Sequence, residues 1–159
     1  FISRNMDALF FLTQFAARRM ASARSGSIIN ISSNGAVLAH RQRIAYDSFK
    51  GAMEAFTRAV AVDLAPWGVR VNAIRPIAIR ETAAPGSDAE ALAARLGAMV
   101  PMGRIAGPSD AAALAVFLAG DDSAFITGQV INVDGAMLEQ SRPPQLELEP
   151  VVGPDDIEL

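Results

Sequence analysis

Amphipathic helical segments alternate with short β-branched segments along residues 6–74, and this alternation constrains the fold more than any other feature. Apolar residues with helical spacing predict a helix from Met6 to Ala23 and a second from Ile44 to Leu64. The runs Ser27 to Ser33 and Val69 to Ile74 are typical of strands buried in a parallel sheet, the first of them in a central position. Strands separated by helices require right-handed crossovers, so we predict an α/β fold with a doubly wound parallel sheet.

The second half of the chain continues this order after a long connection. Residues 80–107 are rich in alanine, glycine and proline, with one helix predicted at Asp88 to Met99. A long insertion after a strand is more often a lid or a binding loop than a plain connection. Ser109 is predicted to cap a helix from Asp110 to Leu118, and Gly128 to Val133 is predicted to be a third strand.

The last residues differ in composition from the rest. Residues 139–159 are acidic and rich in proline, which predicts a disordered tail. We therefore divide the chain into an α/β unit of residues 1–138 and a tail of residues 139–159. The first residue is Phe1 and not Met, so we expect the chain to be cut from a longer one.

The composition excludes several classes of function. With 51% hydrophobic residues, 19% charged residues and a net charge of -3, the chain is neither a disordered protein nor a basic nucleic-acid binder. It has no cysteine and one histidine, which leaves little material for a metal site or a nucleophilic triad. The longest uncharged apolar run, Ala111 to Gly120, is too short to span a membrane, and no secretory signal pattern opens the chain. We expect a cytoplasmic protein.

One pair of residues carries a chemical signal. Tyr46 and Lys50 are the only tyrosine and the only lysine, and they lie four residues apart on one face of a predicted helix. An ammonium close to a phenol stabilises the phenolate, which suits the pair for acid/base catalysis, whereas the alternative is a chance pair on a solvated helix face. Ser32 and Ser33 end the preceding strand, and ligands in open α/β sheets bind beyond such strand ends. His40 is expected to line the loop or the pocket.

Four segments in order resemble the classical short-chain dehydrogenases/reductases over most of residues 5–137. They are INISS at 29–33, the run from Ala45 to Pro76 that begins AYDSFKG, PMGRIAGPSD at 101–110 and FITGQVINVDGA at 125–136. The resemblance implies the C-terminal part of a Rossmann-like domain. The N-terminal dinucleotide-binding strands of the family, with their Gly-rich phosphate loop, would lie upstream of Phe1.

The resemblance also implies hydride transfer between NAD or NADP, with the preference open, and a carbonyl or alcohol substrate. Tyr46 would exchange the proton with the substrate oxygen and Ser33, thirteen residues earlier, would orient that oxygen. Lys50 would support the tyrosine and hold the nicotinamide ribose, and Asn5 would anchor a water of the proton relay. The cofactor-binding residues implied are Tyr46, Lys50, Pro76, Ile79 and Thr82. Ile77 stands where the family usually has glycine, which is unfavourable if the backbone there needs a positive φ.

The sequence leaves the substrate class and the oligomeric state undecided. The motifs resemble those of 3-oxoacyl reductases and of alcohol, sugar and steroid dehydrogenases alike. By resemblance the first and second helices would form a four-helix interface in a homodimer or homotetramer, and the edge of the first strand would be unpaired in this chain alone, which predicts self-association and no activity in isolation. The alternative function is a catalytically inactive half-domain that binds a partner through those helices.

Overall fold

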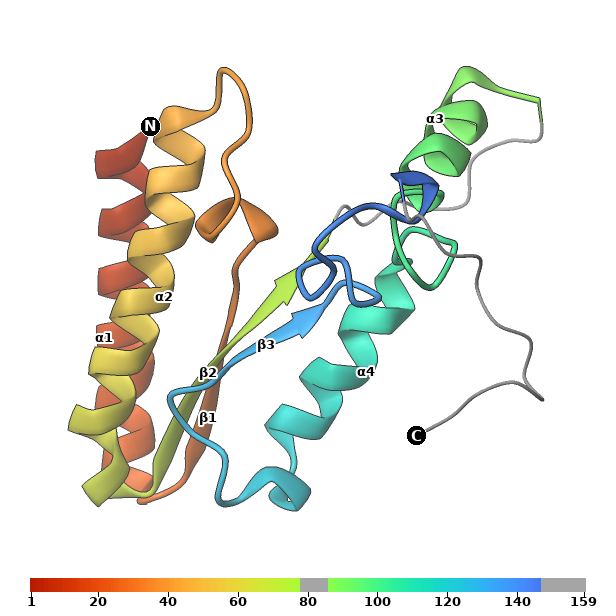
Figure 1. Cartoon of the computed structure of the whole chain (residues 1–159). Helices are drawn as coiled ribbons and strands as arrows, with labels where there is room; N and C mark the ends of the chain where they lie inside the picture. Colours follow the sequence, from red (N-terminus) through yellow and green to blue (C-terminus); the bar gives the residue numbers. More distant parts are fainter. Residues whose placement is uncertain (78–85, 147–159) are drawn as a thin grey trace.

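Three parallel strands and four α-helices make up the part of the chain that the computed structural model describes, residues 1–77 and 86–146 (Figure 1). In chain order they are α1 (Ile2–Ala23), β1 (Gly26–Ile31), α2 (Ile44–Leu64), β2 (Val69–Pro76), α3 (Asp88–Gly97), α4 (Pro108–Ala119) and β3 (Val130–Val133). Short 3-10 turns lie at Asn34–Ala36, Ala65–Trp67, Asp121–Ser123 and Pro144–Leu146.

The sheet has the order β1-β2-β3, with both pairings parallel. Helices α1 and α2 lie together on one side of the sheet and α4 lies on the other, as Figure 1 shows. This arrangement confirms the predicted α/β fold with helices on both faces of a parallel sheet. The central position predicted for Ser27–Ser33 is wrong for this chain, because β2 is the middle strand. The unpaired edge that the resemblance implied for this strand is confirmed within the described residues: β1 pairs with β2 alone, and its last residue, Ile31, is 47% exposed.

The two long helices follow the apolar periodicity. The observed α2 has the predicted ends, while α1 begins at Ile2, a turn before the predicted Met6. After α2, Gly68 adopts φ 72° and turns the chain into β2. A Cβ at Gly68 would lie 2.6 Å from the carbonyl oxygen of Arg24, so this close approach requires glycine.

Some predicted boundaries need correction. Ser109 is not the cap of α4: the helix begins at Pro108, whose fixed φ suits the first helical position, and Gly107 is the N-cap. The Asp110 carboxylate accepts a 2.8 Å hydrogen bond from the Gly107 N–H and so caps the helix from its third position. Strand β2 also ends later than the predicted Ile74, because Pro76 still pairs with Val133 and is the last residue of the strand.

Strand β2 forms the centre of the core. Its residues Val69, Val71, Ala73 and Ile74 are at most 1% exposed. Asn72 is fully buried among them, and its amide donates 2.8 Å to the Ile126 carbonyl and accepts 3.0 Å from the Gln129 N–H. Both polar ends of the amide are therefore satisfied, and they fix the loop that leads into β3.

Helix α1 exposes a row of large apolar side chains in the described chain. Those between residues 10 and 15 are Phe10, Phe11, Leu12 and Phe15. The rings of Phe10 and Phe56 nevertheless lie 6.1 Å apart, which packs α1 against α2. Single exposed apolar residues are ordinary, but a group of four on one helix is typical of a surface that another chain covers.

Part of the predicted tail contacts the residues that follow α3. The Gln140 side chain donates 2.8 Å to the Met99 carbonyl, and the Gln145 side chain donates to the Ala98 carbonyl. Residues 147–159 lie outside the described residues, so disorder there stays a prediction. None of the helices in residues 1–77 and 86–146 combines the length and the apolar character that crossing a membrane needs.

Candidate active site

A cleft of about 590 Å³ opens at the carboxyl ends of β1 and β2. It is lined by Ile31, Ser32, Ser33, Asn34, Leu38, Ala39, His40, Arg43, Tyr46, Lys50, Pro76, Ile77, Leu96, Met99, Ile105 and Met137. Three of the predicted catalytic residues, Ser33, Tyr46 and Lys50, and the predicted cofactor contact Pro76 are therefore in one place. The carboxyl ends of parallel strands are where open α/β sheets bind their ligands.

Tyr46 and Lys50 lie one turn apart on α2. Lys50 Nζ is 5.7 Å from the centre of the Tyr46 ring and donates 2.6 Å to the carbonyl oxygen of Ile31. Partial burial disfavours the charged amine and lowers the pKa of Lys50 below its ordinary 10.5. An ammonium has three donors, so the bond to Ile31 leaves two for a ligand in the cleft.

The two serines that follow β1 have different partners. Ser32 is buried and donates 2.7 Å to the Glu54 carboxylate. The Ser33 hydroxyl accepts 3.1 Å from the Gly35 N–H and lies 3.2 Å from the Asn34 side-chain oxygen, both within its own turn. Ser32 is therefore committed to the core, whereas the partners of Ser33 are local groups at the wall of the cleft.

A buried ion pair contacts the first of these serines, Ser32. Arg75 on β2 donates from Nε and Nη2 to the two carboxylate oxygens of Glu54, at 2.8 and 2.6 Å, and from Nη1 to Asn132 on β3 at 2.9 Å. Burial raises the pKa of Glu54, but hydrogen bonds from Arg75 and Ser32 outweigh it and leave that pKa below its ordinary 4.5. The pair ties α2 to β2 and β3, and Glu54 also holds Ser32, which follows β1.

The loop between β1 and α2 is held by His40 and Asp47. The two oxygens of Asp47 accept from the His40 N–H at 2.7 Å and contact His40 Nδ1 at 2.8 Å. These bonds, with smaller contributions from the charges of His40 and Arg43, lower the pKa of Asp47 below 3.8. The His40 ring lies 6.4 Å from the Tyr46 ring and lines the cleft, which confirms the expected pocket-lining position.

Ile77 closes the sheet side of the cleft without backbone strain. It is absent from the residues of the described chain with positive φ, and its N–H donates 3.2 Å to the Val133 carbonyl. Its side chain is buried against Val100, Ala106 and Met137. The position accepts a β-branched residue because its φ is not positive. Ile79 and Thr82 lie outside the described residues, so their cofactor contacts stay predictions.

Asn5 is the one predicted catalytic residue within the described chain that does not line the cleft. It lies in the first turns of α1, where its side-chain amide donates 2.9 Å to the Phe1 carbonyl. The Phe1 ring meets the Phe49 ring edge-on at 6.2 Å, so this end of α1 packs beside the turn of α2 that precedes Lys50.

Comparison with known proteins agrees with this architecture. A family model described as enoyl-(acyl carrier protein) reductase matches residues 1–137. The structure of a short-chain type dehydrogenase/reductase from Mycobacterium ulcerans superposes with a TM-score of 0.75 at 34% identity, over 87% of this chain and 51% of that one. The chain belongs to the short-chain dehydrogenase/reductase family.

Other relatives of this short-chain dehydrogenase/reductase have names that refer to different substrates. The glucose and ribitol dehydrogenase homolog of Oryza sativa is 40% identical over 140 residues, which is 84% of this chain and 47% of that protein. A gluconate 5-dehydrogenase from Burkholderia cenocepacia, in complex with NADP and tartrate, has a TM-score of 0.76 at 30% identity, over 86% of this chain and 54% of that one. The chain therefore spans about half the length of the relatives that it matches.

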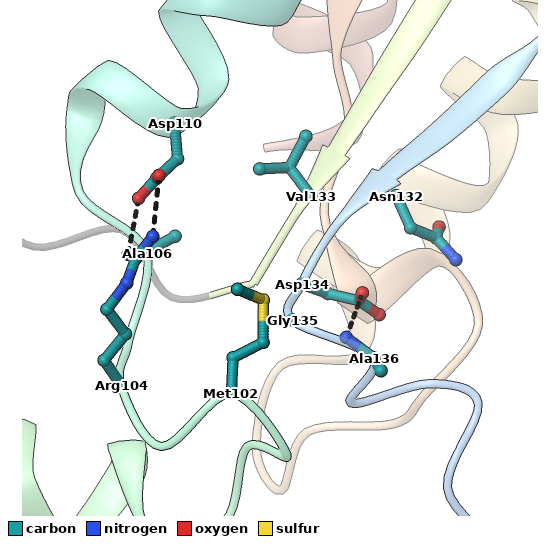
Figure 2. A pocket seen from close by; sticks show the side chains of 9 residues that line it. All are labelled: Met102, Arg104, Ala106, Asp110, Asn132, Val133, Asp134, Gly135 and Ala136. Carbon is teal, nitrogen blue, oxygen red and sulfur yellow. Dashed lines mark hydrogen bonds and ion pairs between the residues drawn. The ribbon is translucent and has the colours of Figure 1, made fainter. Parts of the chain in front are cut away.

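A second pocket of about 420 Å³ lies beyond the carboxyl end of β3 (Figure 2). Arg104 donates to both oxygens of Asp110, at 2.7 and 2.9 Å, and together with the Gly107 N–H this lowers the pKa of Asp110 to about 2. The Asp134 oxygens accept from the Ala136 and Leu138 N–H groups at 3.1 and 3.0 Å. All these charged groups are engaged within the fold, so we assign this pocket no chemistry.

Several cleft residues of this short-chain dehydrogenase/reductase were not predicted. Arg43 is three residues before Tyr46, and residues three apart lie on one side of a helix. This spacing could have indicated that Arg43 lines the cleft. Leu96, Met99 and Ile105 come from the predicted lid excursion, but no local pattern indicates that they would line the same cleft as Tyr46. The Glu54–Arg75 pair joins residues 21 apart, and only its charges inside apolar segments could have signalled it.

Proposed function

We propose that this chain carries the catalytic half of an NAD(P)-dependent oxidoreductase that interconverts a carbonyl compound and a secondary alcohol. The observation that carries the proposal is the convergence of Ser33, Tyr46 and Lys50 on one cleft at the carboxyl ends of β1 and β2. A hydroxyl, a phenol and an amine at one oxygen-binding position are the groups that a carbonyl reduction needs, because the developing alkoxide must be stabilised and then protonated.

The donor set fits the ribose of a nicotinamide cofactor. Lys50 has donors beyond its bond to Ile31, and the Tyr46 hydroxyl belongs to the same cleft, so two neighbouring hydroxyls could be bound between them. NAD(P) would supply or accept the hydride. Pro76 and Ile77 form the wall beside these groups, and the relatives include a dehydrogenase in complex with NADP and a dehydrogenase named as NAD-dependent.

Each residue of the chain has a separate task in this proposal. Tyr46 gives its proton to the carbonyl oxygen in reduction and takes the hydroxyl proton in oxidation. Ser33 donates a hydrogen bond to the same oxygen and orients it. Lys50, held by Ile31, keeps a positive charge near the phenol and so stabilises the phenolate form of Tyr46. Anchoring of a relay water by Asn5 stays a prediction.

The test of this proposal is a variant that lacks the hydroxyl oxygen of Tyr46. In the polypeptide that contains this chain, Tyr46→Phe is expected to lower kcat for NAD(P)-dependent alcohol oxidation by about 10²- to 10⁴-fold, the usual contribution of a general acid/base. Ser48→Ala is the matched control, since it removes a hydroxyl from an exposed position of α2 outside the cleft. An undiminished rate in Tyr46→Phe would show that the acid/base assignment is wrong and would favour a non-catalytic binding module.

A further inference from the structure

The charge of the cleft is one-sided. Among its lining residues in the described part of the chain are two basic side chains, Arg43 and Lys50, together with His40, and no carboxylate. Two acids contact lining residues from behind: both oxygens of Asp47 are engaged by His40, and both oxygens of Glu54 are engaged by Arg75. Along the part of the wall that the described residues form, a ligand therefore meets positive charge and no free carboxylate.

Arg43 is the cation available to a substrate. It is the N-cap residue of α2, where its side chain makes no capping hydrogen bond, and it is exposed. Its guanidinium carbon lies 5.8 Å from the centre of the Tyr46 ring. Within residues 1–77 and 86–146 no carboxylate forms an ion pair with Arg43, whereas the amine of Lys50 is bound to Ile31.

One wall of the cleft is apolar. Five side chains form this wall: Leu38, Leu96, Met99, Ile105 and Met137. Leu38 and Met99 are 45% and 39% exposed, so apolar surface is accessible to a ligand there. Polyhydroxylated chains would set hydroxyl groups against this wall without partners, whereas a short alkyl chain would be buried favourably.

We propose that Arg43 determines specificity by binding a carboxylate of the substrate, so that the cleft takes short-chain hydroxy acids and the corresponding oxo acids. A guanidinium binds a carboxylate through two parallel hydrogen bonds, which also orients it. Since Arg43 and Tyr46 are neighbours, the acid group and the reacting carbon are separated by only a few bonds. This inference rests on the proposed function, in which the hydroxy acid loses a hydride to NAD(P)+ and a proton through Tyr46.

The first test compares acids with amides. Full polypeptides carrying the wild-type sequence, Arg43→Gln or Arg41→Gln are assayed with hydroxybutyrates and hydroxyhexanoates and with the matching primary amides. Arg41 is also exposed but does not line the cleft, so it controls for the loss of a surface charge. We expect the wild type to prefer acids, and Arg43→Gln to raise KM for acids by about 10- to 100-fold, the loss of a charge-assisted hydrogen bond, with the amides unaffected. Equal effects on acids and amides, or no preference for acids in the wild type, would overturn the inference.

The second test separates this inference from the proposed function. Calorimetric titration measures binding of 3-hydroxyhexanoate to Tyr46→Phe and to Arg43→Gln, with no turnover required. Binding that persists in Tyr46→Phe and is lost in Arg43→Gln supports the carboxylate site even if no variant oxidises any alcohol. Saturable binding in neither variant, or equal binding in both, contradicts it.

Discussion

The buried pair of Glu54 and Arg75 offers the sharpest prediction on stability. The side chains of Glu54 and Arg75 are 5% and 14% exposed. Removing Glu54 would leave a guanidinium with one remaining partner, Asn132, and a buried Ser32 hydroxyl without its acceptor. Because an unpaired buried charge is far costlier than a missing pair, we expect Glu54→Gln to cost about 3 kcal/mol and Glu54→Ala about 3 to 5 kcal/mol.

A double replacement and an exposed pair serve as controls. Replacing Glu54 and Arg75 together with Met removes both charges, so it should cost less than Glu54→Ala alone. Arg104 makes the same kind of two-point contact with Asp110, but its side chain is 57% exposed, so Arg104→Met should cost about 1 kcal/mol or less. Urea unfolding of the polypeptide that contains the chain, followed by circular dichroism, measures all four variants.

The pH dependence has a definite sign. The pKa of Glu54 is lower in the folded state than its ordinary 4.5, so the unfolded chain binds the proton more readily. The stabilisation is present above about pH 4.5 and is lost as the pH falls through the folded pKa. The variant without both charges should lose less stability over that range. Costs below about 1 kcal/mol for both single replacements, with no change in acid sensitivity, would refute the account of the pair.

Two further predictions concern a turn and a surface. Gly68 and Gly103 have the same φ of 72°, but only Gly68 has a backbone oxygen, that of Arg24, in the place of a Cβ. Gly103→Ala should cost about 1 kcal/mol and Gly68→Ala clearly more, and equal unfolding midpoints would contradict the role of the close approach. The exposed apolar row on α1 predicts that the 159-residue chain self-associates and that Phe11→Lys weakens this, as light scattering would show. A monodisperse wild-type monomer that melts cooperatively would exclude that prediction.

Local sequence patterns predicted most of the fold, because helices and buried strands have their own periodicities. The ends of α2 follow from its apolar spacing and from Gly68 just beyond it. The start of α4 was not predicted correctly from local patterns. Pro108 and the carboxylate of Asp110 together begin the helix, whereas Ser109 was the stronger single N-cap signal in the sequence. The position of β1 at an edge depends on which strands are present, so it followed from the family resemblance and not from any pattern within β1.

The candidate site was predictable to the extent that its members are close in sequence. Tyr46 and Lys50 share one helix face, and Ser33 ends the strand beside it. The pairing of Arg75 could not be predicted, because Arg75 lies in an otherwise apolar strand segment and its partner Glu54 belongs to a different element. Contacts of this kind depend on the packing of α2 on the sheet, which local spacing does not specify.

The central claim is that Ser33 and Tyr46 act on one substrate oxygen as a unit. The direct test is kcat/KM for alcohol oxidation in Ser33→Ala, Tyr46→Phe and the double variant, each in the full polypeptide. Residues that act as a unit are strongly non-additive, so the double variant should be about as slow as Tyr46→Phe alone. Losses that multiply in the double variant, or a rate that neither replacement lowers, would contradict the account.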